Sequence, residues 1–518
     1  MHEIITLQFG SQANYAGTHY WNAQESYFTY NEQDPSPVDH NVSFRPGRGA
    51  DGSDTYSPRT LIYDLKGAFG TLKRENALYE LQNQPDPIQQ NAWGRDAMSL
   101  RLPPIEPSLY QQALDAGTDL PALTTQSVRF WSDYNHIFYH PRSIVQLNEY
   151  ELNSSLMPFE RYGAGDELFT NLDREHDLLD RDLRPFLEEC DQLQGIQIFS
   201  GTDDAWGGFT ARYLERVADE LGKGSRWVFA LEEGRSATRE RKMLQLSNAA
   251  QSLYSVVPSA SMYVPLSNAP ARLPSYLSMD ASSPWHTSAL QAALIETTTL
   301  PARLKDDEVG HASFDELEAT LSGDGKRPIL EAALSASDST NLSGGAAVNG
   351  DHDRRLANGA NGTSDNDADT ALDIAFMPDT PRILGSQSAP GRPKTYTKTE
   401  STRGAWKSSL EIQDANLASR DRYVSGARTT IHQTALLLPQ LPSYPKIFQG
   451  LAVEDKIAVM SSLSTSTRVA KHVRGMAAFA GQSHMLDERE AVYDGLVSMA
   501  EEYEEGFDDL SSEESDDD

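Results

Sequence analysis

The N-terminus constrains the fold of this chain most, because a short buried strand, a glycine turn and a helix follow one another directly. The strand ends at Gly10 and contains the apolar residues Ile4, Ile5, Leu7 and Phe9. A helical pattern begins at about Gln12, with one apolar face formed by Ala13, Ala16 and Tyr20. This succession opens α/β nucleotide-binding units, so we expect a fold of that class.

The same unit recurs in the middle of the chain. An apolar strand over 195–199 is followed by the small polar turn Ser200–Asp204 and by a helix with an apolar stripe at Phe209, Tyr213, Val217 and Leu221. Further buried strands are predicted over 60–65 and 227–231. Strands that alternate with helices predict a mostly parallel sheet covered on both faces.

Two segments have compositions that disfavour folding. Residues 337 to about 400 are rich in Ser, Asn, Asp and Gly at first and then contain Pro, so we predict a disordered insert there. The last stretch, 501–518, holds 11 carboxylates and no basic residue, and we predict a disordered acidic tail.

Charge and cysteine content exclude several classes of function. The formal net charge of −32 argues against direct nucleic-acid binding and against adhesion to anionic membranes. Cys190 is the single cysteine, which excludes an intrachain disulfide and fits a reducing compartment. No apolar run of roughly 18 residues predicts a transmembrane segment, and the start resembles neither a signal peptide nor a mitochondrial presequence. Any contact with an organelle is therefore expected from the cytosolic side.

Several segments resemble tubulin. At the N-terminus the matching residues stand at tubulin's spacings: Glu3, Ile4, Ile5, Gln8, Gly10, Asn14 and Gly17. Cys190–Gln197 resembles the segment leading into tubulin's glycine-rich phosphate loop, and Tyr56–Arg59 with Asp64 resembles the approach to its second strand.

Five further segments are distinctive: Phe130–Tyr134, His140–Ser143, His286–Leu290, Thr299–Pro301 and Ser443–Pro445. They resemble segments of the Misato family of tubulin-related proteins, which has fungal misato-like members, and this match is better than the one to tubulin. The resemblance implies a role in mitochondrial distribution, morphology and mitochondrial DNA inheritance. It also implies a tubulin-like α/β fold: a parallel, Rossmann-like nucleotide-binding-type sheet domain, a second α+β domain and a helical C-terminal region.

We accordingly divide the chain into five parts. They are a nucleotide-binding-type domain over 1–245, the first part of an intermediate domain over 246–336, the disordered insert over 337–400, an intermediate and C-terminal helical region over 401–500, and the acidic tail over 501–518.

The two predicted phosphate loops keep only part of the tubulin pattern. A tubulin-type GTPase holds phosphates with backbone N–H groups at helix N-termini, and glycine permits the close approach. The residues kept, which form a remnant nucleotide site, are Gly10, Ser11, Gln12, Asn14, Gly201 and Thr202. Asp203, Asp204 and Trp206 depart from the small residues of the family, and Ala13 replaces a glycine. One interpretation is a magnesium-bridged nucleotide site; we favour a degenerate loop that preserves the fold.

No other catalytic or metal site is predicted. Asp315, Glu316 and Glu318 are the nearest carboxylates to the acidic loop that tubulin uses for hydrolysis, but they fit the first turn or wet face of a helix. His136 and His140 are spaced as metal ligands on a helix could be, yet Pro141 and the aromatic surroundings favour a structural pair.

The leading hypothesis is a non-catalytic tubulin-fold protein at the cytosolic face of the mitochondrion and in the cytoplasm. Its expected partners are proteins of the mitochondrial surface or the cytoskeleton. The alternatives are a GTP-binding or GTP-hydrolysing assembly protein similar to tubulin and FtsZ, with GTP as its cofactor, and a regulator of microtubules.

Overall fold

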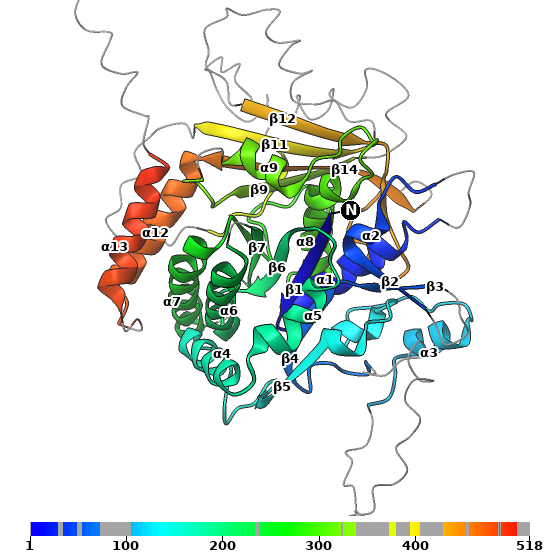
Figure 1. Cartoon of the computed structure of the whole chain (residues 1–518), viewed down its shortest axis with the longest axis horizontal. Helices are drawn as coiled ribbons and strands as arrows, with labels where there is room; N and C mark the ends of the chain where they lie inside the picture. The colour runs from blue at the N-terminus through cyan, green and yellow to red at the C-terminus, as the bar shows by residue number, and fades with distance from the viewer. Residues whose placement is uncertain are drawn as a thin grey trace, which may run out of the picture.

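A computed structural model gives the arrangement of the chain (Figure 1). The described residues are 2–29, 35–48, 54–72, 105–222, 224–233, 238–322, 325–337, 372–379, 394–404, 428–451, 455–484, 486 and 488–504.

A parallel sheet forms the centre of the molecule. Its strands, in spatial order, are β5 (Ile144–Glu151), β4 (Thr60–Lys66), β1 (Glu3–Phe9), β6 (Leu193–Gly201), β7 (Ser225–Glu232) and β8 (Met262–Ser267). Every neighbouring pair is parallel, and Leu7 of β1 pairs with Leu61 on one side and Ile198 on the other. The predicted strands over 60–65, 195–199 and 227–231 are thus confirmed.

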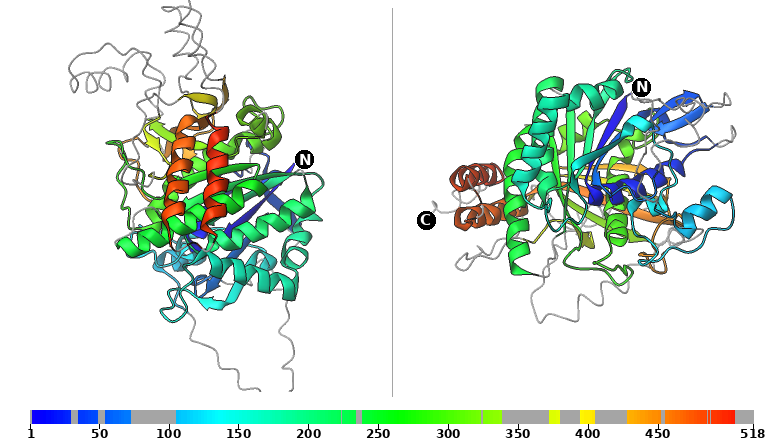
Figure 2. Two further views of the ribbon diagram at one scale, coloured as in Figure 1. Left: turned by 90° about the vertical axis from the view of Figure 1, so that its left-hand side faces the viewer. Right: turned by 90° about the horizontal axis from the view of Figure 1, so that it is seen from below.

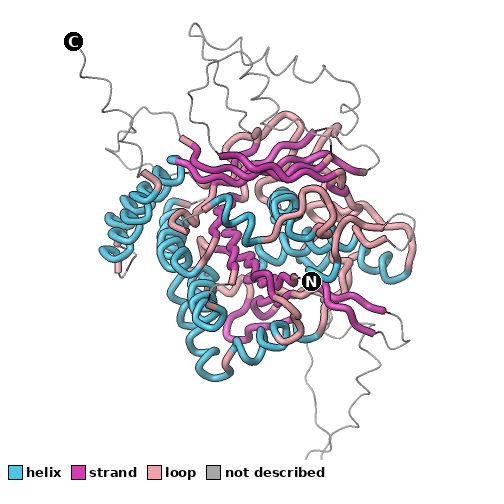
Figure 3. Tube along the Cα trace, turned by 45° about the horizontal axis from the view of Figure 1, so that its top comes forward, coloured by secondary structure: helices cyan, strands magenta, loops and turns pink. Residues whose placement is uncertain are grey.

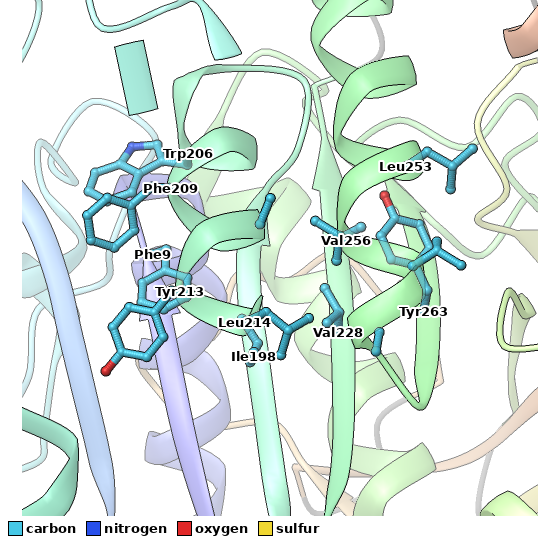
Figure 4. Packing of buried hydrophobic residues seen from close by; sticks show 14 of the residues in the cluster. Phe9, Ile198, Trp206, Phe209, Tyr213, Leu214, Val228, Leu253, Val256 and Tyr263 are labelled. Atoms are coloured by element: carbon cyan, nitrogen blue, oxygen red, sulfur yellow. The ribbon is translucent and has the colours of Figure 1, made fainter. Parts of the chain in front are cut away.

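Helices cover both faces of this sheet, as predicted (Figure 2). On one face lie α4 (Tyr162–His176), α6 (Ala205–Leu221) and α7 (Arg239–Val256), and on the other α1 (Ser11–Glu25) and α8 (Pro284–Thr299). Phe209, Tyr213 and Val217 of α6 are fully buried against the sheet, whereas Leu221 is half-buried (Figure 4). Nearly all of α8 is buried, and its polar residues Gln291 and Glu296 have partners within the chain.

A second sheet packs on the other side of α8. It follows the order β10 (Ile374–Ala375), β9 (Glu331–Ser337), β14 (Lys456–Ser466), β11 (Thr395–Arg403) and β12 (Arg428–Thr434), and β13 (Leu438–Pro439) pairs with β14. All its pairs are antiparallel except β11 with β12. The Thr298 hydroxyl of α8 lies 3.1 Å from the Ser461 hydroxyl of β14, so α8 lies between the two sheets.

Shorter elements complete the described part. They are α2 (His40–Ser43), the hairpin β2 (Phe44–Arg48) and β3 (Asp54–Pro58), α3 (Leu109–Ala116), α5 (Arg184–Leu187) and α9 (Phe314–Leu321). There are also the short 3₁₀ helices η1 (Trp131–Tyr134), η2 (Pro141–Ser143), η4 (Val257–Ser259) and η5 (Leu300–Arg303), and the π-helical turn η3 (Leu179–Leu183). The helices α12 (Thr467–Gln482) and α13 (Arg489–Glu502) run side by side and pack on α7 (Figures 2 and 3). None of the helices in the described part of the chain is long and apolar enough to cross a membrane.

A buried ionic triad ties α8 to the second sheet. The Glu296 carboxylate of α8 pairs with Arg303 at 2.8 Å and with Arg403 of β11 at 2.6 Å, and all three side chains are almost completely buried. Gln24 of α1 also donates a hydrogen bond to Glu296, and Arg403 donates to the Tyr27 hydroxyl at 2.8 Å. The triad therefore joins α1, α8 and the second sheet at one point.

The predicted division of the chain needs three corrections. The boundary at 245 falls inside α7, and β8 lies beyond it, so the parallel sheet continues past that boundary. The prediction of disorder over 337–400 is wrong for β10 and for the start of β11, because pairing with β9 and β14 orders them. Among the described residues of 401–500, the helices are α12 and α13, and the strands β12, β13 and β14 precede them. Residues 338–371, 380–393 and 505–518 lie outside the described residues.

Candidate functional site

The two predicted loops meet at the carboxyl edge of the parallel sheet. β1 and β6 are neighbours, and Phe9 pairs with Ser200, so the chain leaves both strands at the same level. Gly10, Ser11, Gln12 and Asn14 therefore lie beside Gly201 and Thr202. The six residues singled out from the sequence therefore lie at one edge of the sheet, the edge where open α/β sheets bind ligands.

A buried carboxylate occupies the start of α1. Ser11 Oγ donates to Asp64 Oδ2 at 3.0 Å and Asn14 Nδ2 donates to the same oxygen at 2.7 Å. The Leu65 backbone N–H donates to Asp64 Oδ1 at 2.9 Å. Burial raises the pKa of Asp64 to about 6, although these hydrogen bonds oppose the shift. Two polar side chains of the first loop are thus already bound to an anionic group of the chain itself.

Gln12 points to another part of the edge. Its amide Nε2 donates to Asn268 Oδ1 at 2.6 Å, and Gln291 of α8 donates to the same oxygen at 2.7 Å. Asn268 follows β8, and its backbone N–H is bound to the carbonyl of Glu232. The predicted loop residue Gln12 therefore joins α1 to the loop after β8.

The second loop is held by its own carboxylates. Asp204 is the N-cap of α6 and accepts a hydrogen bond from the Trp206 backbone N–H at 2.8 Å. Asp203 accepts from the Glu233 backbone N–H at 2.8 Å, which ties the loop to the end of β7. Thr202 is fully buried, and its N–H donates to the carbonyl of Leu231. Asp204 therefore binds a backbone N–H at the helix N-terminus where a phosphate would be expected to bind.

Acidic groups gather around this loop. Burial raises the pKa of Asp203 well above its usual range, and the neighbouring charges of Asp204 and Glu232 add to the shift. Burial raises the pKa of Asp204 and of Glu232 to about 7 each. A nucleotide triphosphate bound here would place further negative charge beside carboxyls that burial already favours in the protonated form, and like charges repel.

Trp206 covers the first loop. A side-chain carbon added at Gly10 would lie 2.5 Å from the indole Nε1, so the ring rests directly on the Gly10 backbone. The ring packs against Phe209 and against Phe159 of the loop that precedes α4, and it is 5% exposed (Figure 4). Gly10 has a φ of +88°, a conformation that favours glycine. The indole therefore fills the space that a bound phosphate would need above Gly10.

The other sequence candidates lie elsewhere. The Ser313 hydroxyl and the Glu316 carboxylate form a capping box at the start of α9, while Asp315 accepts from Ser225 and Glu318 from the Trp227 indole. Ser313, Asp315 and Glu316 lie with His2 and Gln192 around a cavity at the amino edge of the sheet, opposite the loops. These carboxylates are engaged within the chain and do not reach the loops.

The two histidines also have partners within the chain. His136 Nε2 lies 2.6 Å from the Tyr110 hydroxyl, and His140 Nδ1 accepts from the Arg142 backbone N–H. Both lie outside regular helices. Among the residues that the structure describes, no group of three or more His, Cys, Asp or Glu side chains is arranged to hold a metal ion.

Sequence reasoning missed Glu232 and the covering of Gly10 by Trp206. Glu232 could have been found, because it directly follows the predicted strand Trp227–Leu231. The carboxyl ends of parallel strands meet at one edge of a sheet, so a residue at that position is expected near the loops after β1 and β6. The sequence shows that Trp206 departs from the small residues of a phosphate loop. It does not show that the indole lies on Gly10, because that contact depends on the pairing of β1 with β6.

Comparison with known proteins gives the family. Residues 2–116 match the Misato Segment II tubulin-like domain, and residues 120–304 match the tubulin domain. A protein of Aspergillus clavatus named Protein dml1 is 44% identical over the full length of both chains. The chain belongs to the Misato family of tubulin-like proteins. Among other Misato relatives, Protein dml-1 of Neurospora crassa is 43% identical over the full length of both chains. Protein dml1 of Schizosaccharomyces pombe is 33% identical over 63% of this chain and 70% of its own.

The Misato-type and tubulin matches together contain the whole parallel sheet. All of β1 to β8, with α1, α6 and α8, lies within residues 2–304. The second sheet and the α12–α13 pair lie beyond these matches, in a part that the full-length Misato relatives share.

Proposed function

We propose that this Misato-family chain is a non-catalytic tubulin-fold protein that acts in the distribution and morphology of mitochondria. In this proposal it also serves the partitioning of mitochondria and mitochondrial DNA at inheritance. Support for the process comes from the family resemblance. Support for a non-catalytic role comes from the carboxyl edge of the sheet.

One observation carries the non-catalytic part of the proposal. The Trp206 indole rests on the Gly10 backbone, and the adjacent Asp204 carboxylate caps α6. Phosphate binding at a helix N-terminus needs free N–H groups and open space above a glycine. Here Asp204 accepts from one of those N–H groups and the Trp206 ring occupies the space above Gly10, which supports a role that needs no nucleotide.

A second candidate function is GTP binding with tubulin-like assembly. Its support is that Gly10, Asn14, Gly201 and Thr202 come together at the edge of the sheet. GTP would be the cofactor of that alternative, while the favoured function needs none. Regulation of microtubules through the fold or the acidic tail is a third alternative. Its support is the net charge of −32, which would attract basic partners of any kind.

The proposed location is the cytosolic face of the mitochondrion and the cytoplasm. The net charge of −32 opposes direct adhesion to anionic lipid, so attachment through protein partners at the mitochondrial surface or the cytoskeleton is the simpler route.

The test is deletion followed by complementation. Deleting the gene should disturb mitochondrial shape or the transmission of mitochondrial DNA, and the unaltered chain should restore both. A Gly201→Ala chain should restore them equally well, because the methyl group would meet the Asp204 side chain first, at 3.1 Å, and that side chain can shift slightly. The same methyl group would keep a phosphate away from the Gly201 backbone, so a nucleotide-dependent protein would lose function. Normal mitochondria in the deletion strain would contradict the process. Failure of a folded Gly201→Ala chain to complement would favour the GTP alternative.

A further inference from the structure

The loop that joins β5 to α4 presents two large apolar side chains to solvent. Leu156 is 93% exposed and Met157 is 55% exposed, and we name this pair the Leu156–Met157 knob. The loop lies at the carboxyl edge of the sheet, at the bottom of Figure 1, on the same edge as Gly10 and Asp204. Adjacent exposed apolar side chains of this size are a feature of protein-binding surfaces.

The base of the loop is firmly anchored. Phe159 packs on Tyr150 at a ring distance of 4.7 Å and on Trp206 at 5.2 Å. Asn248 of α7 donates to the carbonyl of Glu160 at 2.7 Å. Because the base is fixed, little conformational freedom remains to be lost when a partner covers the tip, and such pre-ordering strengthens binding.

The tip is ordered by local hydrogen bonds as well. The Ser154 backbone N–H donates to the carbonyl of Glu151 at 3.1 Å, and Ser154 Oγ accepts from the Met157 N–H at 3.3 Å. Asn153 takes a left-handed conformation with a φ of +59°, which turns the chain at this point. The knob is thus held out from the surface by the turn that precedes it.

The surroundings of the knob are more acidic than basic. Glu149 and Glu151 at the end of β5 and Glu160 after the knob are exposed, and we name them the acidic rim. The nearby cations are Lys66 and Arg161, and the whole chain carries a net charge of −32. A field of this sign speeds association with basic proteins and opposes association with acidic ones.

We infer that the Leu156–Met157 knob and the acidic rim form a docking surface for a protein partner that presents an apolar face bordered by Lys or Arg. The apolar pair would supply the buried centre of the contact and the rim would select the charge of the partner. This docking surface is an inference beyond the proposed function, and it holds whether or not the chain binds a nucleotide. An experiment can therefore contradict the docking surface without contradicting the proposed function.

The test uses the full chain and two short amphipathic helical peptides with the same leucine face, one with lysine and one with glutamate on its polar face. Fluorescence anisotropy should show binding of the lysine peptide and much weaker binding of the glutamate peptide. A Leu156→Ser, Met157→Ser double variant should bind the lysine peptide at least about tenfold more weakly. Val309→Ser is the matched control, because Val309 is 82% exposed in a loop far from the knob, and it should not change binding.

Three results would overturn the inference. The first is equal affinity of the knob double variant and the unaltered chain for the lysine peptide, with both chains melting at the same temperature. The second is equal affinity of the unaltered chain for the two peptides. The third is knob-dependent co-sedimentation with phosphatidylcholine vesicles, which would make the knob a lipid contact.

Discussion

At the residue scale, the contacts of three side chains determine the structure of the two loops at the carboxyl edge of the parallel sheet. Trp206 lies on Gly10, Asp204 caps α6, and Asp64 binds Ser11 and Asn14. A carboxylate of the chain can satisfy the same N–H donors that a phosphate would satisfy, without any ligand. In this arrangement Asp204 binds a backbone N–H of α6 and Asp64 binds two side chains of α1, which supports our proposal that the loops are structural.

Loss of the cap gives a first prediction. Asp204→Ala should be less stable than Asp204→Asn by about 1 kcal/mol, because the Trp206 N–H at the start of α6 loses its acceptor only in the alanine variant. Both variants remove the buried carboxylate whose pKa is raised by burial, so comparing them isolates the cap. Chemical denaturation of the three proteins measures the difference. Equal destabilisation by both substitutions would show that the charge, and not the cap, is what matters.

The raised pKa values give a pH prediction. Burial raises the pKa of Glu232 from 4.5 to about 7, so the folded state holds a proton that the unfolded state releases at lower pH. Glu232 makes its full contribution to the free energy of unfolding at pH values below its pKa in the unfolded state. This contribution is lost as the pH rises through the pKa of Glu232 in the folded state. The free energy of unfolding should thus fall between pH 4.5 and about 7.

Glu232→Gln isolates this group from the other titrating residues. The variant should be more stable than the unaltered chain near neutral pH, by about 2 kcal/mol, and nearly equal at acidic pH. Denaturant titrations across the pH range measure both proteins. A constant difference at every pH would contradict the assignment of the shift to Glu232.

At the element scale, α8 is the link between the two sheets. Its Glu296 carboxylate holds Arg303 and Arg403, one of them from β11, in a site closed to solvent. Two guanidinium groups share one carboxylate there, and Arg403 also donates to Tyr27. A buried carboxylate with such partners is costly to remove, since the charges left behind are not compensated.

Removing the carboxylate tests this link. Glu296→Gln should lower the free energy of unfolding by about 3–5 kcal/mol, because two buried cations lose their counter-charge. Glu240→Gln, at an exposed position at the start of α7, is the control and should change stability little. Thermal or denaturant unfolding measures both. A loss for Glu296→Gln as small as that of the control would show that the triad contributes nothing.

Elements whose signal is local could be predicted from the sequence. β1, β6 and β7 could be predicted because each contains a short apolar run, such as Trp227–Leu231 in β7. α6 could be predicted because Phe209, Tyr213 and Val217 recur at helical spacing. β8 was missed, since Pro265 interrupts its pattern and its pairing with β7 is a long-range contact. β12 is largely polar, and β10 has only two residues, so neither shows a strand pattern.

The residues of the candidate site also fall into those that the sequence could predict and those that it could not. Gly10, Asn14, Gly201 and Thr202 were chosen because they match tubulin's phosphate-loop pattern, and the structure places them at one edge of the sheet. The contacts of Asp64, of Glu232 and of the Gln12–Asn268 pair could not be predicted, because they depend on strand order across the sheet.

At the scale of the whole molecule, the chain combines a tubulin-type parallel sheet, a second sheet beyond α8 and a C-terminal helix pair. The composition of residues 340–370 predicts that they add nothing to this framework. Deleting them should leave the melting temperature unchanged.

A matched control exists a few residues further on. Phe376 is completely buried, and its N–H donates to the carbonyl of Ala332. Phe376→Ala should therefore lower the melting temperature clearly, as buried aromatic truncations do. A comparable fall on deleting 340–370 would show that this segment is part of the folded core. Differential scanning calorimetry compares the three proteins.

The central claim is that the Gly10 and Gly201 loops have become structural and no longer bind nucleotide. It is tested most directly by titrating the purified full chain with a fluorescent GTP analogue in the presence of magnesium. We expect no saturable binding, because Trp206 covers Gly10 and Asp204 already caps α6. Saturable micromolar binding that a folded Gly201→Trp variant abolishes would contradict the claim.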